Sequence, residues 1–360
     1  MKVVLDNFDF SNGFEELLPL IKAEYPTGEM GDSEYLDWEY FQNPLGTPEM
    51  VVARSESDEV VGQYVVIPQN YIVDGETVSG SLSLNTLTHK DFRGQGLFTR
   101  MALETYASCK VRGLDLTLGF PNMQSYPGFV RKLGFSHIGN AMLLVRPLRL
   151  GALVKGALYR KRYPKYGSYL ERESLNRTGQ HDVDEITISE FDVKQEAGLY
   201  RPFWETRRKL YNQTDRSPQF LEWRYKNIPT RSYTLLKATK GGKLLAFAVL
   251  RVRVVYGMKA GFVIDFNCLP EEESMRAGKT LLEFSKSLMR SKGAVFMGAL
   301  ITPDCAEFDV LRKSGFFKAP GRFLPHDAPV IIRWNGAGDS AASLRTIRKW
   351  FLTFGDYDAF

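Results

Sequence analysis

Hydrophobic and polar positions along the first half of the chain follow a pattern that predicts strands leading into helices. The pattern predicts strands over residues 60–68, 71–73 and 81–88, a helix over about 97–111, a buried strand over 114–118, and a helix over 126–132 that stops at Gly134. A glycine suits the left-handed conformation that often ends a helix. Strands that lead into crossover helices indicate an α/β fold built on a mixed sheet.

The second half repeats this order of elements. Its pattern predicts strands over residues 244–255 and 261–266, a helix over 277–291 and a strand over 295–301.

Two sequence echoes support a duplication. EYLDWEYFQNP at residues 34–44 resembles QFLEWRYKNIP at residues 219–229, with a proline six positions after the tryptophan in both. FVRKLGF at residues 129–135 resembles VLRKSGF at residues 310–316. Both echoes keep their order along the chain, so we expect two copies of one fold. The expected divisions are a first domain (1–145), a basic linker (146–183), a second domain (184–335) and an aromatic tail (336–360).

Composition narrows the class of protein. A chain of 360 residues favours two domains, and 44% hydrophobic with 25% charged residues is ordinary for globular proteins. The net charge of +5 is too mild to indicate a nucleic-acid partner. Three scattered cysteines form no metal or disulfide framework. With no leader-like start and no apolar run of spanning length, we expect a cytoplasmic protein that uses no metal.

The segment NTLTHKDFRGQGLF at residues 85–98 carries the clearest chemistry. A strand ends near Thr88, and Arg93-Gly94-Gln95-Gly96 then opens a helix. Glycines let backbone amides approach a ligand closely, and a helix start supplies unpaired N–H donors and a partial positive charge. With the charge of Arg93 added, the segment predicts a site for a pyrophosphate. The alternative is a glycine-rich turn that binds nothing.

This arrangement resembles the coenzyme A loop of the GCN5-related N-acetyltransferases (the GNAT superfamily), and Arg131 to Phe135 resembles the closing segment of that fold. The resemblance implies two tandem GNAT-like domains, the second degenerate, with acetyl-CoA as cosubstrate of the first. The coenzyme-binding residues it implies are Leu87, Thr88, His89, Arg93, Gly94, Gln95, Gly96, Leu97 and Phe98.

The second copy lacks this loop. Its nearest equivalent, residues 272–279, begins with acidic residues that would repel a pyrophosphate. We expect the second domain to bind no coenzyme and to support or shape the acceptor pocket. The overall pattern looks most like tandem acetyltransferases associated with bacterial surface-polysaccharide synthesis.

The resemblance implies direct attack of an acceptor amine on the thioester, which requires a proton acceptor and an acid for the leaving thiolate. The usual acid of the family is a tyrosine at the position of Val130. Tyr126 lies one helical turn earlier and shares its face, so it is the candidate acid; the alternative is a packing aromatic.

The base is less clear from the sequence. The strand over 81–88 has no carboxylate, and Ser83 and Asn85 there can order a water. For His89 we favour contact with phosphate over a role as base. Glu34, Asp37 and Glu39 precede the first strands, and we expect most of these charges to coat a helix.

The end of the chain is unusually aromatic. In some tandem relatives the chain end reaches the active site, so Asp356, Asp358 and the terminal carboxylate of Phe360 are candidate bases. The alternative is a tail that closes an interdomain groove.

A basic stretch follows the first domain. Residues 146–165 contain seven Lys or Arg and no acid, interleaved with apolar residues. Such a stretch suits peripheral contact with an anionic membrane, or a linker.

The leading function is acetylation of an amino sugar, as a sugar nucleotide or lipid-linked glycan precursor, and the sugar rests on resemblance alone. Alternatives are a small amine or antibiotic as acceptor, aminoacyl transfer from tRNA, which the intact loop disfavours, and a CoA-binding sensor or scaffold without catalysis. The sequence gives no oligomeric state.

Overall fold

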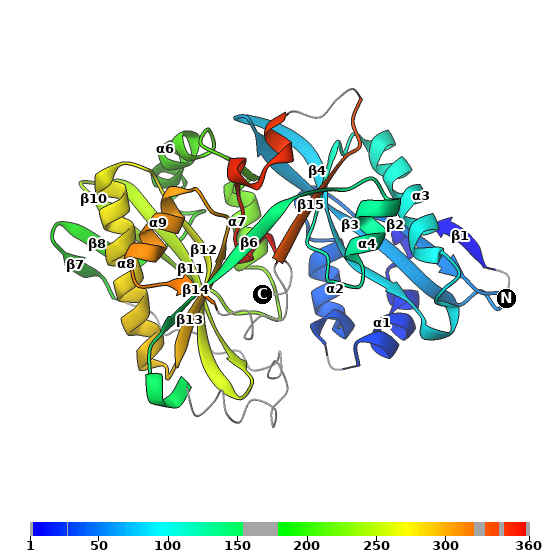
Figure 1. Cartoon of the computed structure of the whole chain (residues 1–360), viewed down its shortest axis with the longest axis horizontal. Helices are drawn as coiled ribbons and strands as arrows, with labels where there is room; N and C mark the ends of the chain where they lie inside the picture. The colour runs from blue at the N-terminus through cyan, green and yellow to red at the C-terminus, as the bar shows by residue number, and fades with distance from the viewer. Residues whose placement is uncertain (1–2, 27, 154–178, 320–327, 338–341, 358–360) are drawn as a thin grey trace. The chain divides into compact units, whose positions relative to one another are not determined.

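The computed structural model describes residues 3–26, 28–153, 179–319, 328–337 and 342–357 (Figure 1). The chain forms two compact units, and each is assembled from two stretches of sequence. Unit 1 comprises Met1–Gly139 with Ala328–Thr346, and unit 2 comprises Asn140–Asp327 with Ile347–Phe360.

Unit 1 is a mixed sheet with helices packed on it. Its elements are β1 (Val4–Asn7), α1 (Leu18–Glu24), α2 (Ser33–Tyr40), β2 (Glu49–Arg54), β3 (Val60–Val73), β4 (Glu76–Thr88), α3 (Leu97–Arg112), β5 (Leu116–Gly119), α4 (Tyr126–Lys132), the start of β6 (Ser136–Pro147), and β15 (Ala328–Trp334). The strand order is β1-β2-β3-β4-β5-β15. Neighbours are antiparallel except β4 and β5, which are parallel and are joined by α3 as crossover helix.

Strand periodicity explains how this sheet is buried on both faces. Val51 and Ala53 of β2 belong to the core cluster that α3 and α4 cover. Val52 lies between them, is equally buried, and therefore faces the other side of the sheet. Helix α1 contacts β3 and β4, and α3 contacts β2, β3 and β4.

Unit 2 has a sheet of the same kind. Its elements are most of β6, β7 (His181–Val183), β8 (Ile186–Glu190), α6 (Ala197–Arg207), β9 (Asn212–Thr214), α7 (Pro218–Tyr225), β10 (Thr234–Lys240), β11 (Lys243–Val255), β12 (Met258–Cys268), α8 (Glu272–Ser291), β13 (Phe296–Ile301), α9 (Ala306–Lys313), β14 (Phe317–Lys318) and β16 (Trp350–Phe351). The main order is β7-β8-β10-β11-β12-β13-β6, with β12 and β13 parallel.

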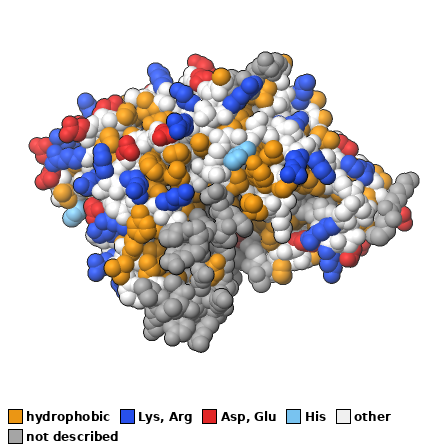
Figure 2. Space-filling model, in the orientation of Figure 1, with side chains coloured by type: hydrophobic (Ala, Val, Ile, Leu, Met, Phe, Trp, Pro, Cys, Tyr) orange, Lys and Arg blue, Asp and Glu red, His pale blue; other side chains and the backbone are white. Residues whose placement is uncertain are grey.

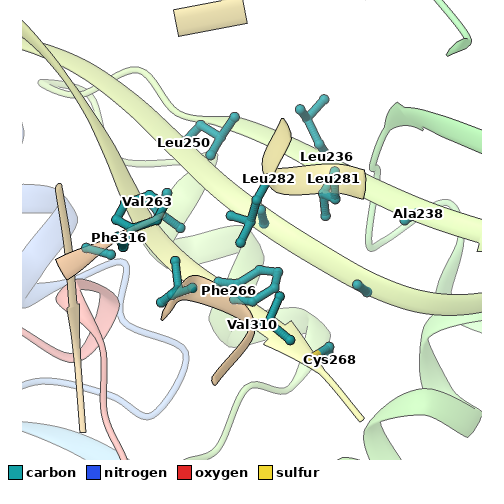
Figure 3. Close-up of a cluster of buried hydrophobic side chains, with 14 of the residues drawn as sticks. Leu236, Ala238, Leu250, Val263, Phe266, Cys268, Leu281, Leu282, Val310 and Phe316 are labelled. Atoms are coloured by element: carbon teal, nitrogen blue, oxygen red, sulfur yellow. The ribbon is translucent and has the colours of Figure 1, made fainter. Parts of the chain in front are cut away.

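The long helix α8 covers this second sheet. It contacts β10, β11 and β12, and Leu281 and Leu282 on its buried face are fully inaccessible. Figure 3 shows these leucines beside Val263 and Phe266 of β12, with Val310 of α9 nearby. The apolar side chains of one sheet face and two helices thus form one continuous core.

The two units follow a similar order of elements around the two tryptophans of the first sequence echo. Trp38 lies in α2 and Trp223 in α7, and each helix precedes an antiparallel run of strands and a parallel pair. β4 and β12, the first strand of the parallel pair in each unit, both have a register shift against their antiparallel neighbour. The shift in β4 lies opposite Gln63 to Val65 of β3, and the shift in β12 lies opposite Val249 to Leu250 of β11.

The units differ from the predicted divisions in their last strands. β15 falls within the stretch expected to belong to the second domain, but it pairs with β5 of unit 1. The tail from Ile347 belongs to unit 2. The segment expected as a basic linker begins inside β6, and most of it, including Lys161 and Arg162, lies outside the described residues.

Candidate active site

The parallel strands at the centre of unit 1 separate at one end. β4 and β5 pair from Gly80↔Leu116 to Ser83↔Gly119, where β5 ends, while β4 continues to Thr88. A cavity of about 580 Å³ opens there. Its lining comes from residues 83–88 of β4, residues 120–122 after β5, Gln124, Ser125, Gly128 and Phe129 around the start of α4, Phe98 of α3, Arg93, and Glu24 and Tyr25 at the end of α1.

A β-bulge bends β4 beside this cavity. Gln63 of β3 lies opposite Leu87, but Val65 lies opposite Leu84, so β4 has one extra residue. Asn85 within the bulge has φ +48°, which Asn tolerates better than most residues. Its carbonyl oxygen accepts a hydrogen bond from Gln63 Nε2 at 3.0 Å. Bulges are frequent next to active sites because they redirect a strand and its side chains.

The loop after β4 presents a row of backbone donors. Gly94 (φ +80°) and Gly96 (φ +73°) are both left-handed, and a Cβ added to either would meet no atom within 4 Å. Among the residues that the structure describes, none accepts a hydrogen bond from the backbone amides of residues 94–98. α3 begins here with no acidic residue in its first turn. Consecutive amides at a helix start form an anion-binding surface.

Arg93 ties the loop to its surroundings. Its Nη2 lies 2.5 Å from a carboxylate oxygen of Glu24, and its Nε donates to the Thr88 carbonyl at 3.0 Å. Glu24 therefore partly neutralises the positive charge of Arg93, although 58% of the Arg93 side chain is exposed. His89 instead caps the short 3₁₀ turn Lys90–Phe92, and its ring lies edge-on to Phe92.

The predicted coenzyme ligands divide into two groups. Leu87, Thr88, Arg93 and Phe98 line the cavity. His89, Gly94, Gln95, Gly96 and Leu97 are not among the lining residues and form the loop and helix start that follow.

Tyr126, the predicted acid, is not brought to the cavity. It is the first residue of α4, its ring lies 5.5 Å from that of His137, and it packs on the core cluster of unit 1. Its neighbours Ser125 and Phe129 line the cavity, but Tyr126 does not. Val130, at the usual position of the family's acid, also packs on that core.

Asp356, a predicted base, lies inside unit 2. It is 3% exposed, and its carboxylate accepts a hydrogen bond from Arg216 Nη2 at 2.8 Å. The other two candidates at the chain end, Asp358 and Phe360, lie outside the described residues.

The structure also shows a carboxylate whose importance the sequence did not reveal. Glu39 of α2 is only 1% exposed and is the exception among the three acidic residues expected mostly to coat a helix, whereas Glu34 is exposed. Glu39 accepts hydrogen bonds from Tyr35 OH at 3.1 Å and from Asn85 Nδ2 at 2.6 Å. The spacing of Tyr35 and Glu39 by one helical turn could have indicated their contact from the sequence, but nothing in the sequence indicated the contact with Asn85.

Aromatic side chains close the inner side of the cavity behind Ser83. The hydroxyls of Ser83 and Tyr64 are hydrogen-bonded at 3.1 Å, and Tyr64 also bonds the hydroxyl of Tyr106. The Tyr64 ring lies 5.8 Å from Phe98 and 6.5 Å from Phe129. Burial raises the pKa of both tyrosines, so they stay neutral and form a fixed wall.

In unit 2 the corresponding backbone is covered by the protein itself. Cys268 ends β12 as Thr88 ends β4, and its amide donates to Glu307 Oε1 at 3.2 Å. Glu307 in turn pairs with Arg207 at 2.9 Å, and both side chains are fully buried. Burial raises the pKa of Glu307, and Arg207 opposes that rise. An internal carboxylate thus occupies this end of the strand.

Residues 353–356 lie against β12 and β13 where these two strands separate. Thr353 forms a bridge with Ile301, the last residue of β13, while Asp356 and Asp265 of β12 share Arg216. The apolar side chains of this segment are at most 3% exposed; they are Trp350, Phe351, Leu352 and Phe354.

Within the described ranges, no group of His, Cys, Asp and Glu is arranged to hold a metal ion. No described helix has the length and apolar character to cross a membrane. On the face drawn in Figure 2, Lys and Arg side chains are dispersed among acidic, apolar and uncharged ones.

Comparison with known families identifies the part of the chain that holds this cavity. Residues 25–138 match the family described as acetyltransferase (GNAT) domain. The match includes the separated strands, the glycine loop and α4. The chain therefore carries a GNAT acetyltransferase domain, and the predicted GNAT type of N-acyltransferase is confirmed at the level of this domain. No curated protein matches the sequence.

Solved structures share the fold over nearly the whole chain. A GCN5-related N-acetyltransferase from Anabaena variabilis has a TM-score of 0.63 and 11% identity, over 93% of this chain and 73% of that one. A probable N-acyltransferase from Enterococcus faecalis has a TM-score of 0.62 and 12% identity, over 92% and 72%. Saccharomyces cerevisiae N-myristoyltransferase with bound myristoyl-CoA has a TM-score of 0.59 and 12% identity, over 97% and 89%. These likenesses confirm the predicted mixed α/β fold of GNAT type.

Proposed function

We propose that unit 1 transfers the acetyl group of acetyl-CoA to the amine of an acceptor, an amino sugar carried on a nucleotide or on a lipid-linked glycan precursor. The observation that carries the proposal is the row of backbone amides at residues 94–98, which have no acceptor among the described residues and lie next to a cavity where two parallel strands separate. The amides suit the pyrophosphate of the coenzyme. The cavity then receives the thioester and the acceptor.

The reaction follows from the groups that line the cavity. The amine nitrogen attacks the thioester carbon, a C–N bond forms, the C–S bond breaks to release the thiolate of coenzyme A, and the amine proton passes through water to that thiolate. Amides on the separated stretch of β4, near Leu87 and Thr88, polarise the carbonyl. Among the described lining residues Glu24 is the one carboxylate, and it is paired with Arg93. We therefore assign proton removal to water. Tyr126 packs on the core and Asp356 is buried against Arg216, which disfavours both as acid or base, while Asp358 and the carboxylate of Phe360 stay candidate bases.

The wall behind Ser83 supports an acetyl group over a long acyl chain. Phe98, Phe129 and Tyr64 pack against one another where a longer chain would have to extend. Dense packing leaves no room for further methylenes without displacing a ring.

Unit 2 supports unit 1 in this proposal and binds no coenzyme. The observations in favour are the acidic first turn of α8, with Glu272 and Glu273, and the Glu307 carboxylate on the Cys268 amide. The sugar acceptor and the link to surface polysaccharides come from the sequence resemblance. Peripheral membrane contact through residues 146–165 is part of the same proposal.

The loop is tested by calorimetry with acetyl-CoA on the Gly94→Asp variant. A carboxylate among the amides should repel the pyrophosphate and weaken binding by tenfold or more. Gly75→Asp is a matched control, because Gly75 also has a left-handed φ (+87°), open space for a Cβ, and a position in the β3–β4 turn. If both variants bind equally well, the loop does not hold the coenzyme.

Turnover is tested by thiol release from acetyl-CoA with a panel of amines: UDP-glucosamine, glucosamine and simple alkylamines. The proposal expects UDP-glucosamine or glucosamine to be the better acceptors. The second candidate, a CoA sensor without catalysis, is favoured by the absence of Tyr126 from the cavity lining. It predicts coenzyme binding without thiol release for any amine.

A further inference from the structure

We propose that Glu39 and Asn85 form a positioning pair for the acceptor: Glu39 orients the Asn85 carboxamide so that its oxygen faces the cavity and accepts a hydrogen bond from the attacking amine. The proposal rests on the acetyl transfer proposed above. It names a residue that selects the acceptor and a second residue that acts through it.

The chemistry of the two side chains fixes the orientation of the amide. Asn85 Nδ2 donates a hydrogen bond to Glu39 Oε2 at 2.6 Å, so the NH₂ group of the amide faces Glu39 and the amide oxygen faces away from it. The other carboxylate oxygen is held by Tyr35 OH at 3.1 Å. Both Glu39 and Tyr35 are almost fully buried in α2, so this anchor is rigid.

The carboxamide oxygen is what the pair leaves for a ligand. Asn85 lines the cavity and is partly exposed. In the part of the chain that the structure describes, no group donates a hydrogen bond to Asn85 Oδ1. The bulge and the hydrogen bond from Gln63 Nε2 fix the backbone of Asn85, and rotation of its side chain would break the hydrogen bond to Glu39.

A fixed acceptor oxygen favours amines over alcohols. A primary amine keeps one N–H after it has lost a proton and formed the amide, so its hydrogen bond to Asn85 lasts through the reaction. A hydroxyl loses its only proton on attack, and its oxygen would then face the lone pairs of Asn85. Buried or ordered acceptors left without a donor oppose binding of the wrong group.

Glu39 itself lies behind Asn85 and does not line the cavity, so we assign it a positioning role and not that of a base. The two roles differ in pH dependence. Loss of a general base removes the acidic limb of the pH profile and slows turnover by about 10²-fold or more. Loss of a positioning carboxylate lowers kcat/KM while the acidic limb stays.

The test uses the full chain and the amine of the panel with the highest turnover. In Asn85→Gly the carboxamide is removed while the left-handed backbone is tolerated, and kcat/KM for the amine should fall about tenfold with acetyl-CoA binding unchanged. Glu39→Ala should match that loss, and Glu39→Gln, which can still accept from Asn85 Nδ2, should lose less. Asp58→Gly is the control, because Asp58 is exposed, has φ +66° and lies outside the cavity.

Several outcomes would overturn the proposal: an unchanged kcat/KM in Asn85→Gly, an unchanged value in Glu39→Ala, loss of acetyl-CoA binding in Asn85→Gly, or loss of the acidic limb in Glu39→Gln. If one of the Asn85 and Glu39 variants fails to fold, the others still decide, because each tests one member of the pair. No thiol release with any amine refutes the proposed function itself, and this proposal with it.

Discussion

At the scale of single residues, the two units differ most where their central strands separate. Asn85 lies two residues after Ser83, the last residue of β4 that pairs with β5. Asp265 lies two residues after Val263, the last residue of β12 that pairs with β13. Asn85 faces a cavity, whereas Asp265 binds Arg216 at 2.8 Å and is fully buried. One backbone arrangement thus gives an open site or a filled one, according to which side chains follow the bulge.

The sequence revealed some of these residues and not others. The glycines of the loop could be found because their spacing, after a strand and before a helix, has a direct backbone meaning. Glu39 could not, because a charged residue on a short helix is exposed far more often than buried. Its partner Asn85 lies 46 residues away, and such a contact exists only once the sheet has formed.

A residue-scale prediction concerns acyl-chain length. Phe98→Ala should open the aromatic wall and raise kcat/KM for butyryl-CoA, relative to acetyl-CoA, about tenfold or more, because each added methylene then finds space. The comparison is made by thiol release with a series of acyl-CoA lengths.

The control for this prediction is Leu103→Ala. Leu103 lies on the same helix and is 48% exposed, so its truncation should leave the ratio unchanged. A Phe98 variant with the same preference as the unaltered chain would place the acyl group elsewhere.

At the scale of elements, the periodic helices were the best predicted parts. The helix expected over 97–111 ends at Arg112, and the helix expected over 126–132 has those bounds. β3 was expected as two strands and is continuous from Val60 to Val73, because pairing with β4 overrides the break that Pro68 indicates locally. Pairing with another strand decides such cases, and a local sequence pattern does not show which strand that is.

The segment at the end of the chain gives an element-scale prediction. Phe351 is fully buried, and the guanidinium groups of Arg207 and Arg216 lie 4.1 Å and 4.9 Å from its ring centroid. Phe351→Ala should lower the free energy of unfolding by about 3–5 kcal/mol, because it leaves a cavity and removes the ring from two buried cations. Chemical denaturation followed by circular dichroism measures the change.

Phe317→Ala is the matched control in the same unit. Phe317 is 42% exposed, and truncation of an exposed side chain usually changes stability by about 0.5 kcal/mol or less. Similar losses in both variants would mean that the segment does not stabilise unit 2.

At the scale of the whole molecule, the sequence did not predict that β15, a strand late in the chain, joins the sheet of unit 1. β15 pairs with β5, and Asn335 Nδ2 donates to Thr117 Oγ1 across 218 residues. No local pattern shows such a partner, so β15 was expected in the second domain. Its residues give an ordinary strand signal that does not say which sheet the strand joins.

The pairing of β15 with β5 predicts how unit 1 behaves alone. A chain of residues 1–139 should not unfold cooperatively, since Leu116 and Leu118 of β5, fully buried in the intact chain, lose their cover on one edge. Residues 1–139 joined through a Gly/Ser linker to residues 328–346 should unfold cooperatively and bind acetyl-CoA. Calorimetry of both chains makes the comparison, and equal behaviour of the two would mean that β15 is dispensable.

The late position of β15 has a consequence for biosynthesis. A ribosome must translate all of unit 2 up to Asp327 before the strand that covers β5 emerges. Throughout that interval the nascent chain presents an open, apolar sheet edge, the kind of surface on which polypeptides aggregate. Chaperone engagement should therefore persist until translation has passed Trp334, and codon changes that slow translation between β5 and β15 should lower the yield of native protein.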